Sequence, residues 1–223
     1  MALLFSSDFT TSDGWTVTQT NGTVTFNTSI GGKTAAHHTK DANSWGTNGI
    51  STTTPIAGVA GQVVYYSMRS DSTSLDCFGG CWTDQLALLT AFTGRFGVYL
   101  NGDFDIWNGG AAVTDGPAFS TDTWYNLRWT INEDGSVTVD YHADNGTPIY
   151  AVEDWTEIGT CGVVGVNVPD HTTETELYFH TNLNTLGVNV YIADFYWTDN
   201  GSVTAFSPMR GRRGATLVAQ GQM

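Results

Sequence analysis

Charged residues are scarce in this chain, and basic ones are the scarcest. Only 13% of its 223 residues are charged, against about 25% in ordinary soluble domains, and 8 Lys or Arg stand beside 22 Asp or Glu. The resulting net charge of −14 argues against nucleic acid as a partner, because phosphate binding needs clustered basic side chains. Hydroxyl and amide groups, including those of 34 threonines, supply most of the polarity.

Long apolar runs are also missing. No stretch approaches the roughly 18 apolar residues of a membrane-spanning helix. Residues 1–6 contain no basic region and too short an apolar run for a signal peptide. We therefore expect a protein without a membrane span that is made in the cytoplasm of its host.

Cysteine is rare, and neither cysteine nor histidine shows the spacing of a metal site. Cys77 and Cys81 share one short segment while Cys161 stands alone, which leaves free thiols and a local Cys77–Cys81 bridge as alternatives. The five histidines include one adjacent pair, His37 and His38, but no His-x3-His or His-Glu-x-x-His pattern. The residues therefore predict no zinc site and no cofactor.

Turn signals, in contrast, are abundant. Nine Asn-Gly or Asp-Gly pairs punctuate the chain, and several join runs in which apolar and polar residues alternate. Such pairs favour the tight type I′ turn of a β-hairpin, which needs positive φ at both central positions. We therefore predict an all-β protein of two packed antiparallel sheets, for which about 200 to 250 residues is an ordinary length.

Alternation at period two places the expected strands. Residues 15–20 and 23–28 are predicted to form an opening hairpin, and residues 70–84 a loop. Residues 124–131, 136–141 and 148–152 are predicted to form a three-strand meander, with further strands at 62–69, 86–91, 95–100, 103–107, 162–168, 175–179 and 189–197. The residues expected to be buried include Trp124, Leu127, Val137, Val139, Ile192 and Phe195.

Several segments resemble the concanavalin A-like, or laminin G-like, jelly rolls. Trp124-Tyr125-Asn126-Leu127-Arg128, followed by Asp134-Gly135-Ser136-Val137-Thr138-Val139, is similar to two middle strands of that superfamily. Val190-Tyr191-Ile192-Ala193-Asp194-Phe195 resembles its closing strand, and Asp8-Phe9 with Trp15 resembles the opening strand that pairs with it. The resemblance implies a jelly-roll sandwich over residues 1–201, with residues 202–223 as a tail. It also allows a calcium site of the kind that such domains often have.

One expected strand carries a candidate sugar-binding patch. Alternation places Asp103, Asp105 and Trp107 on one face, which we expect to meet solvent. A sugar ring can stack on an indole while its hydroxyls bond to carboxylates, and Trp82 and Asp84 of the expected loop are predicted to lie nearby. The alternative is an edge strand with a solvated face and a loop that caps the core.

Catalytic motifs of related enzymes are missing. The glycoside hydrolases of this superfamily resemble one another in a Glu-x-Asp-x-(x)-Glu strand, in which alternate acids flank the bond to be cleaved, and no such strand occurs here. No Gly-x-Ser-x-Gly motif points to a serine nucleophile. A non-enzymatic role is therefore favoured, with a polysaccharide-degrading enzyme of the same fold as the alternative.

The tail differs from the body in charge. Residues 1–199 hold 5 basic and 22 acidic residues, a net charge of −17, whereas the tail holds Arg210, Arg212 and Arg213 and no acid. We expect these arginines to pair with acids on a neighbouring subunit, while Leu217 and Val218 extend an exposed sheet edge. A disordered terminus is the alternative.

Together these features predict a non-enzymatic virion structural module, such as a capsid decoration, head-fibre or tail protein, with a lectin-like fold. Its expected partners are other virion proteins in a homo-oligomeric or many-copy assembly, and a cell-surface glycan bound at the patch. A bacterial lectin-like adhesin is a further alternative, because the fold by itself fixes no function.

Overall fold

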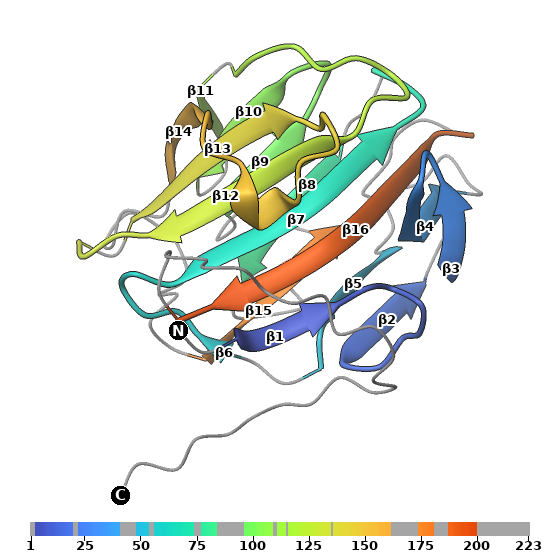
Figure 1. Cartoon of the computed structure of the whole chain (residues 1–223), viewed down its shortest axis with the longest axis horizontal. Coiled ribbons are helices and arrows are strands. Elements are labelled where there is room, and N and C mark those ends of the chain that lie inside the picture. The colour runs from blue at the N-terminus through green and yellow to red at the C-terminus, as the bar shows by residue number, and fades with distance from the viewer. Residues whose placement is uncertain are drawn as a thin grey trace, which may run out of the picture.

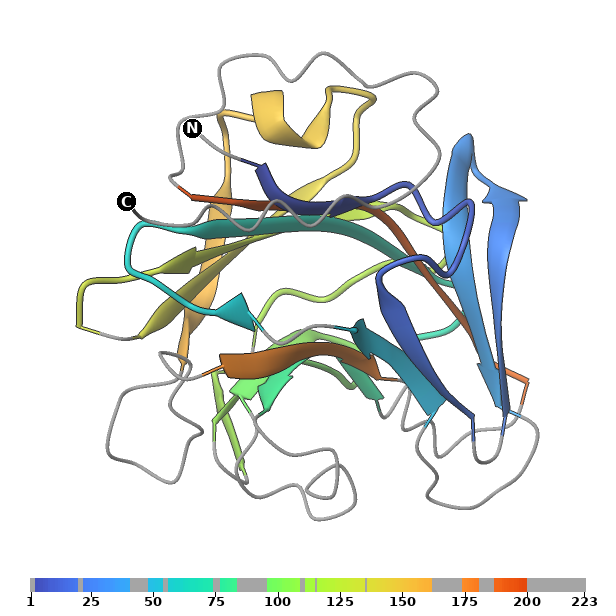
Figure 2. The ribbon, with the colours of Figure 1, turned by 90° about the horizontal axis from the view of Figure 1, so that it is seen from below.

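The computed structural model describes residues 3–19, 22–40, 48–53, 56–73, 77–83, 96–108, 111–114, 116–134, 136–161, 174–180 and 187–199. In this part of the chain the backbone forms sixteen β-strands and one short 3-10 turn. The strands make two eight-stranded sheets that face one another (Figure 1; Figure 2). The predicted two-sheet antiparallel sandwich is therefore confirmed.

The first sheet has the strand order β14-β13-β12-β7-β16-β4-β3, and β1 pairs with the second half of β16. Because β4 pairs with the first half of β16, that strand has a different partner along each half of one edge. The strands of this sheet are β1 (Leu3–Ser7), β3 (Gly22–Ile30), β4 (Lys33–Lys40), β7 (Val63–Ser70), β12 (Tyr125–Ile131), β13 (Val137–Ala143), β14 (Thr156–Cys161) and β16 (Asn189–Thr198).

The second sheet has the order β11-β10-β9-β8-β15-β5-β2, with β6 paired to β15. Its hairpin between β9 and β10 turns at Asn101-Gly102, as the Asn-Gly signal predicts, but only Gly102 has a positive φ, of 84°, so the turn is not of type I′. The strands of this sheet are β2 (Trp15–Gln19), β5 (Asn48–Thr52), β6 (Ile56–Ala57), β8 (Cys77–Thr83), β9 (Phe96–Leu100), β10 (Phe104–Asn108), β11 (Ala111–Thr114) and β15 (Glu174–His180).

The core lies between the sheets and is filled by every second residue of the strands. On β12, for example, Leu127 and Trp129 have no exposed surface, while Arg128 between them points outward and is partly exposed. Burying one large apolar side chain contributes about 1.5–3 kcal/mol. All six residues predicted to be buried are 6% exposed or less: Trp124, Leu127, Val137, Val139, Ile192 and Phe195.

The opening and closing strands meet as the resemblance implies, but the opening strand is Leu3–Ser7, which precedes Asp8-Phe9, and Trp15 begins a strand of the second sheet. β1 pairs with β16 from Leu3↔Thr198 to Ser7↔Phe195. Beside this pair, the Trp15 ring stacks on Phe9 at 5.3 Å and meets Phe195 edge-on at 5.2 Å. Because offset and edge-to-face aromatic pairs are the favoured geometries, this cluster ties the first residues of the chain to the last strand.

The predicted opening hairpin is wrong. β2 and β3 follow one another in the chain, but β2 pairs with β5 in the second sheet and β3 with β4 in the first. Trp15 of β2 and Val24 of β3 are buried in the same core, so alternation correctly indicated a buried face but not the pairing partner. β3 instead turns into β4 through Gly31 and Gly32, whose φ values of 54° and 81° suit glycine best.

The predicted loop at residues 70–84 is also wrong in its second half. Cys77–Thr83 is β8, an interior strand that pairs with β9 and β15. Its register shifts between Phe78 and Gly80, and glycine is common at such bulges. Cys77 and Cys81 both belong to this strand.

The third strand of the predicted meander lies further along the chain. Residues 148–152 are not a strand, because Ile149–Ala151 form the 3-10 turn η2, and β14 takes the third place in the meander. Ile149 is buried on Val63 and Tyr65, on the outer face of the first sheet. The predicted strands at residues 86–91 and 162–168 lie outside the described residues. No helix in the described part of the chain is long and apolar enough to span a membrane.

Candidate functional site

The predicted sugar patch lies on and beside β10, in the second sheet. Phe104 and Ile106 point into the core with no exposed surface, so the predicted alternation of this strand is confirmed. Asp103 precedes the strand, is partly exposed and forms an isolated bridge with Ala118. Asp105, however, is only 9% exposed, and the prediction that it faces solvent is wrong.

A neighbouring segment covers Asp105. After β11 the chain continues along β10, where the Gly116 N–H donates to Asp105 Oδ1 at 3.4 Å and the Phe104 N–H donates to the Pro117 carbonyl at 3.0 Å. The approach is so close that a Cβ on Gly116 would lie 1.7 Å from the Phe104 carbonyl oxygen. The Asp105 carboxylate is therefore held in the wall of the sandwich and has little surface left for a sugar.

The remaining residues of the patch are only partly described. Trp82 of β8 pairs with Phe96, whereas Trp107 of β10 pairs with Gly97, so the two tryptophans occupy successive positions of the register. Asp84 lies outside the described residues, and so do the tail residues Arg210, Arg212, Arg213, Leu217 and Val218. Their predicted roles stay predictions.

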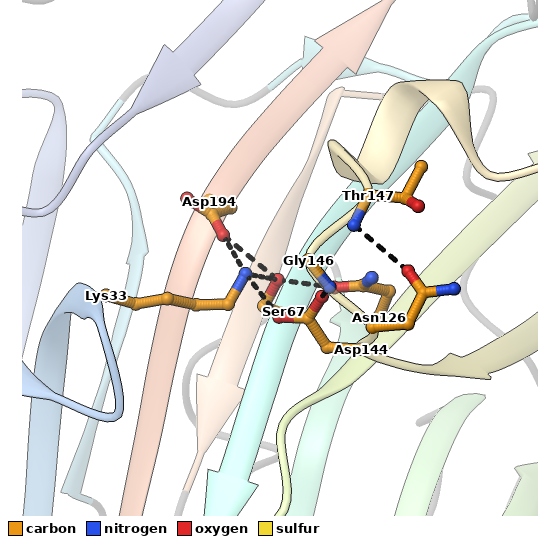
Figure 3. A network of polar contacts seen from close by, with 8 residues as sticks. Lys33, Ser67, Asn126, Asp144, Gly146, Thr147 and Asp194 are labelled. Atoms are coloured by element: carbon orange, nitrogen blue, oxygen red, sulfur yellow. Dashed lines mark hydrogen bonds and ion pairs between the residues drawn. The ribbon is translucent and has the colours of Figure 1, made fainter.

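A charge cluster that the sequence did not predict lies on the outer face of the first sheet (Figure 3). It begins at a β-bulge in β16, where pairing with β4 ends at Ala193, pairing with β1 begins at Phe195, and Asp194 between them has a φ of 52°. Bulges re-aim side chains, and this one brings the Asp194 carboxylate to 3.2 Å from the Ser67 hydroxyl of β7.

Lys33, at the start of β4, lies beside this bulge. Its Nζ is 2.5 Å from Asp194 Oδ2 and 2.9 Å from Asp144 Oδ2, and it donates to Ser67 Oγ at 3.3 Å. Burial lowers the pKa of Lys33, but the carboxylates of Asp194 and Asp144 outweigh burial and leave the pKa raised. The ammonium therefore stays charged at neutral pH. It links β16, β7 and the loop after β13 through Asp194, Ser67 and Asp144.

Asp144 belongs to the loop that follows β13. Burial raises its pKa, but the Gly146 N–H, which donates to Oδ1 at 2.9 Å, and the Lys33 ammonium lower it by more. Asn145 Oδ1 accepts the Thr147 N–H at 3.0 Å, which closes the turn. The cluster thus anchors the loop and the η2 turn, which lie as a layer outside the first sheet in Figure 2.

A row of planar side chains crosses another part of the same outer face. Arg69 of β7, Tyr191 of β16 and His37 of β4 are register partners in neighbouring strands. The His37 ring stacks on Tyr191, with centroids 4.6 Å apart and planes 13° apart, and Arg69 Nη2 donates to Asp122 Oδ1 at 2.7 Å. Burial and the charge of Asp71 raise the pKa of Tyr191 while Arg69 opposes them, so the phenol keeps its proton.

Hydrogen bonds fix His37 at the edge of this row. Asn189 donates to Asp71 twice, from its backbone N–H at 2.8 Å and from its side-chain Nδ2 at 2.5 Å. The Oδ1 atom of the same Asn189 lies 2.7 Å from His37 Nε2. A chain of three side chains therefore runs from an exposed carboxylate to the imidazole.

His38, the next residue, points to the opposite side. It is 1% exposed and pairs in register with Val24 and Val190, both members of the core. Among the described residues, neither of its ring nitrogens has a hydrogen-bond partner. Burial and the neighbouring His37 lower the pKa of His38 to about 3, so its ring is neutral at physiological pH.

Sequence reasoning missed both the charge cluster and the planar row. The sequence shows the adjacent pair His37 and His38, but this pair was considered only as a possible zinc motif, whose spacing it lacks. Asp194 lay in the segment that resembles the closing strand, yet nothing in the sequence marks the bulge that turns its carboxylate outward. Within the described ranges, no group of three or more His, Cys, Asp or Glu residues could hold a metal ion. The carboxylates of Asp144 and Asp194 are neutralised by Lys33 instead.

Comparison with known proteins places the fold. No protein-family model matches the chain, and no curated protein matches it. Among solved structures, lectin II from Ulex europaeus is similar with a TM-score of 0.55 and 11% identity over 83% of this chain and 92% of the lectin. The globular domain of T. cruzi calreticulin is similar with a TM-score of 0.51 and 15% identity over 89% of each chain.

An enzyme shares the same fold. Xylan beta-1,4-xylosidase from Bacillus halodurans C-125 is similar with a TM-score of 0.52 and 10% identity. The match covers 74% of this chain but only 33% of the xylosidase, so the chain spans about a third of that enzyme. These likenesses, at such low identity, show the fold alone. The chain has the two-sheet antiparallel jelly-roll fold that these structures share.

Proposed function

We propose that the chain is a non-catalytic carbohydrate-binding module. The observation that carries the proposal is the row of His37, Tyr191 and Arg69 on the outer face of the first sheet. Tyr191 is buried, so the groups that the row offers to a sugar are the partly exposed imidazole of His37 and the partly exposed guanidinium of Arg69, both of which can bond to sugar hydroxyls. The lectin fold supports the proposal, since the Ulex europaeus lectin II was determined in complex with galactose.

Three carboxylates in the described part of the first sheet and its loops are neutralised by cations, which supports binding rather than cleavage by these groups. Asp140 is paired with Arg128, and Asp144 and Asp194 are paired with Lys33. The acid of a glycosidase must keep its proton near neutral pH, which requires a raised pKa. The pKa of Asp144 is lowered instead, so this carboxyl group is adapted to be a permanent anion.

A glycan array combined with a cleavage assay tests the proposal. The full chain is expected to bind at least one glycan and to release neither reducing nor unsaturated sugar ends from neutral and acidic polysaccharides. Release of such ends would show the enzymatic alternative to be correct, and an array without any binding would refute the proposal. Tyr191→Ala and Trp107→Ala, measured in parallel, decide between the outer-face row and the patch first predicted on β10.

We also propose, as a finer statement, that the module is displayed on a virion and docked there by its tail. The charge difference supports this, because residues 1–199 carry −17 and the tail carries three arginines. Mass spectrometry of purified particles should then detect the chain, and a chain lacking residues 207–223 should no longer sediment with them. Undiminished sedimentation of the truncated chain would show that the body is the docking surface.

A further inference from the structure

We propose that His37 is the hydrogen-bond acceptor of a neutral-sugar subsite on the outer face of the first sheet. Asn189 and Asp71 are the residues that hold it in that role. The inference rests on the proposed carbohydrate-binding function and adds to it the site, the atom and the class of sugar.

The direction of the hydrogen bonds follows from the inventory of donors and acceptors. An ionised carboxylate such as Asp71 only accepts, so Asn189 must turn its Nδ2 group towards it. The Oδ1 atom of Asn189 is then left for His37, and an amide oxygen only accepts. His37 therefore donates from Nε2.

Donation from Nε2 determines the protonation state of the other ring nitrogen, Nδ1. A neutral imidazole carries one N–H and one lone pair, so a proton on Nε2 leaves Nδ1 as an acceptor. Within the described part of the chain no group donates to His37 Nδ1, and this atom is not among the buried atoms that lack a partner. On the partly exposed His37, the fold thus sets in advance the tautomer that leaves Nδ1 as an acceptor.

The surroundings of His37 suit a sugar ring. Its ring stacks against that of Tyr191 on the neighbouring strand, so it has little freedom to turn away. Thr25, its register partner on β3, and Thr23 beyond it are exposed, and the Thr23 hydroxyl bonds to that of Thr39 at 2.8 Å. A ligand over His37 therefore meets hydroxyl groups on one side and the guanidinium of Arg69 on the other, across Tyr191.

The charges near the row select a neutral sugar. Asp71 and Asp122 are exposed carboxylates, and both act electrostatically on Tyr191 in the middle of the row. The guanidinium of Arg69 is already paired with Asp122. A uronate, sialate or sulfate would add a further negative charge beside these two, in a chain with a net charge of −14. At separations of about 8 Å such repulsion is worth roughly 0.5–2 kcal/mol, so acidic glycans are disfavoured.

Two substitutions of His37 distinguish the contribution of its Nδ1 hydrogen-bond acceptor from the contribution of its aromatic ring. His37→Phe keeps an aromatic ring on Tyr191 but removes Nδ1, and His37→Gln removes the ring but keeps an acceptor oxygen. Affinity for the neutral glycan that binds best in the array is expected to fall at least tenfold in His37→Phe and about threefold in His37→Gln. Thr160→Val, on β14 at the far edge of the sheet, is the matched control and should bind like the wild type.

The possible results distinguish failure of the His37 inference from failure of the carbohydrate-binding function. Unchanged binding by His37→Phe, weaker binding by His37→Gln than by His37→Phe, or a preference of the wild type for acidic glycans would overturn this inference and leave the carbohydrate-binding function standing. Absence of glycan binding by the wild type would overturn both. Thermal unfolding of the three variants, expected within a few degrees of the wild type, shows that the measured losses are losses of contact.

Discussion

On β4, His37 faces the outer side of the first sheet and His38 faces the inner side. His37 is bonded to Asn189 and lies at a partly exposed edge. His38 is 1% exposed, lies between Val24 and Val190, and has no hydrogen-bond partner in the part of the chain that the structure describes. Successive residues of a strand point to opposite faces, so one residue type serves as a polar binding group at one position and as core volume at the next.

The two environments differ in what they allow the ring to do. A neutral polar group buried without a partner costs about 1–3 kcal/mol, and a buried charge costs far more. At His38 the folded protein buries a polar ring without a partner, but the ring stays neutral because burial lowers its pKa to about 3. The much larger penalty of a buried charge is therefore absent. At His37 the polar atoms are bonded or meet solvent, so no such cost arises.

The largest expected effect comes from placing a charge at each position. His38→Glu puts a carboxylate among core residues and should destabilise the fold by more than about 4 kcal/mol, whereas His37→Glu should change stability by no more than about 1 kcal/mol. Urea unfolding of both variants measures the difference. Similar losses in the two variants would contradict the assignment of the rings to opposite faces.

The second largest expected effect is a loss of folding stability in acid, caused by the buried His38. Above pH 6.5 His38 is neutral in both the folded and the unfolded chain, whereas between pH 6.5 and its lowered pKa of about 3 only the unfolded chain takes up the proton. Stability is therefore lost as the pH falls through this window. At about 1.4 kcal/mol per pKa unit, the loss reaches roughly 3 kcal/mol by pH 4.

His38→Leu removes this acid sensitivity. The variant should be at least as stable as the wild type at pH 7, because an apolar side chain replaces an unpartnered polar one, and its stability should fall less between pH 6.5 and pH 4. Asp144 does not interfere, since a carboxyl with a lowered pKa gives up its contribution only below its ordinary value of 3.8. Parallel stability curves for the two proteins would refute the role given to His38.

Lys33 is the cation that Asp144 and Asp194 share on the outer face, so replacing it measures how much this ion pairing stabilises the fold. Lys33→Met leaves Asp144 and Asp194 without their shared cation and should destabilise the fold by about 2 kcal/mol. Asp194→Asn in the same chain should restore part of the loss, which a double-mutant cycle measures. At alkaline pH the contribution of Lys33 is complete below pH 10.5 and is lost as the pH rises through its raised pKa.

The smallest expected effect is also the most specific to the outer histidine. Asn189→Ala removes the acceptor of the His37 Nε2 proton and should destabilise the fold by about 1 kcal/mol or less. His37 should then populate both tautomers, which long-range ¹H–¹⁵N spectra resolve, while the signals of His38 stay unchanged. An unaltered His37 spectrum would show that Asn189 does not position the ring.

Much of the sandwich follows from alternation alone. Val137 and Val139, Phe104 and Ile106, and Ile192 occupy the buried positions that a period of two assigns to them. Alternation does not name the neighbouring strand, which is why β2 and β3 were expected to pair. Cys77–Thr83 carries two glycines and no alternation, and only its central place between β9 and β15 makes it a strand.

The site was less predictable than the fold because it depends on contacts between distant segments. The segment Lys33–Lys40 contains two small alanines before its histidines, so no period-two pattern marks it as a strand. Without the strand, nothing assigns His37 and His38 to opposite faces. Asp105 shows the reverse case, since its own strand was predicted correctly and the segment around Gly116 that covers it was not.

The central claim is that His37 offers a preset acceptor to a ligand while His38 stays inert beside it. Long-range ¹H–¹⁵N spectra of the wild-type chain, recorded at neutral pH before and after adding its best neutral glycan, test this most directly. The account predicts His37 protonated on Nε2, an Nδ1 resonance that moves when the sugar binds, and a neutral His38 that does not respond. A proton on Nδ1 of His37, or a His37 spectrum unaffected by the bound sugar, would contradict it.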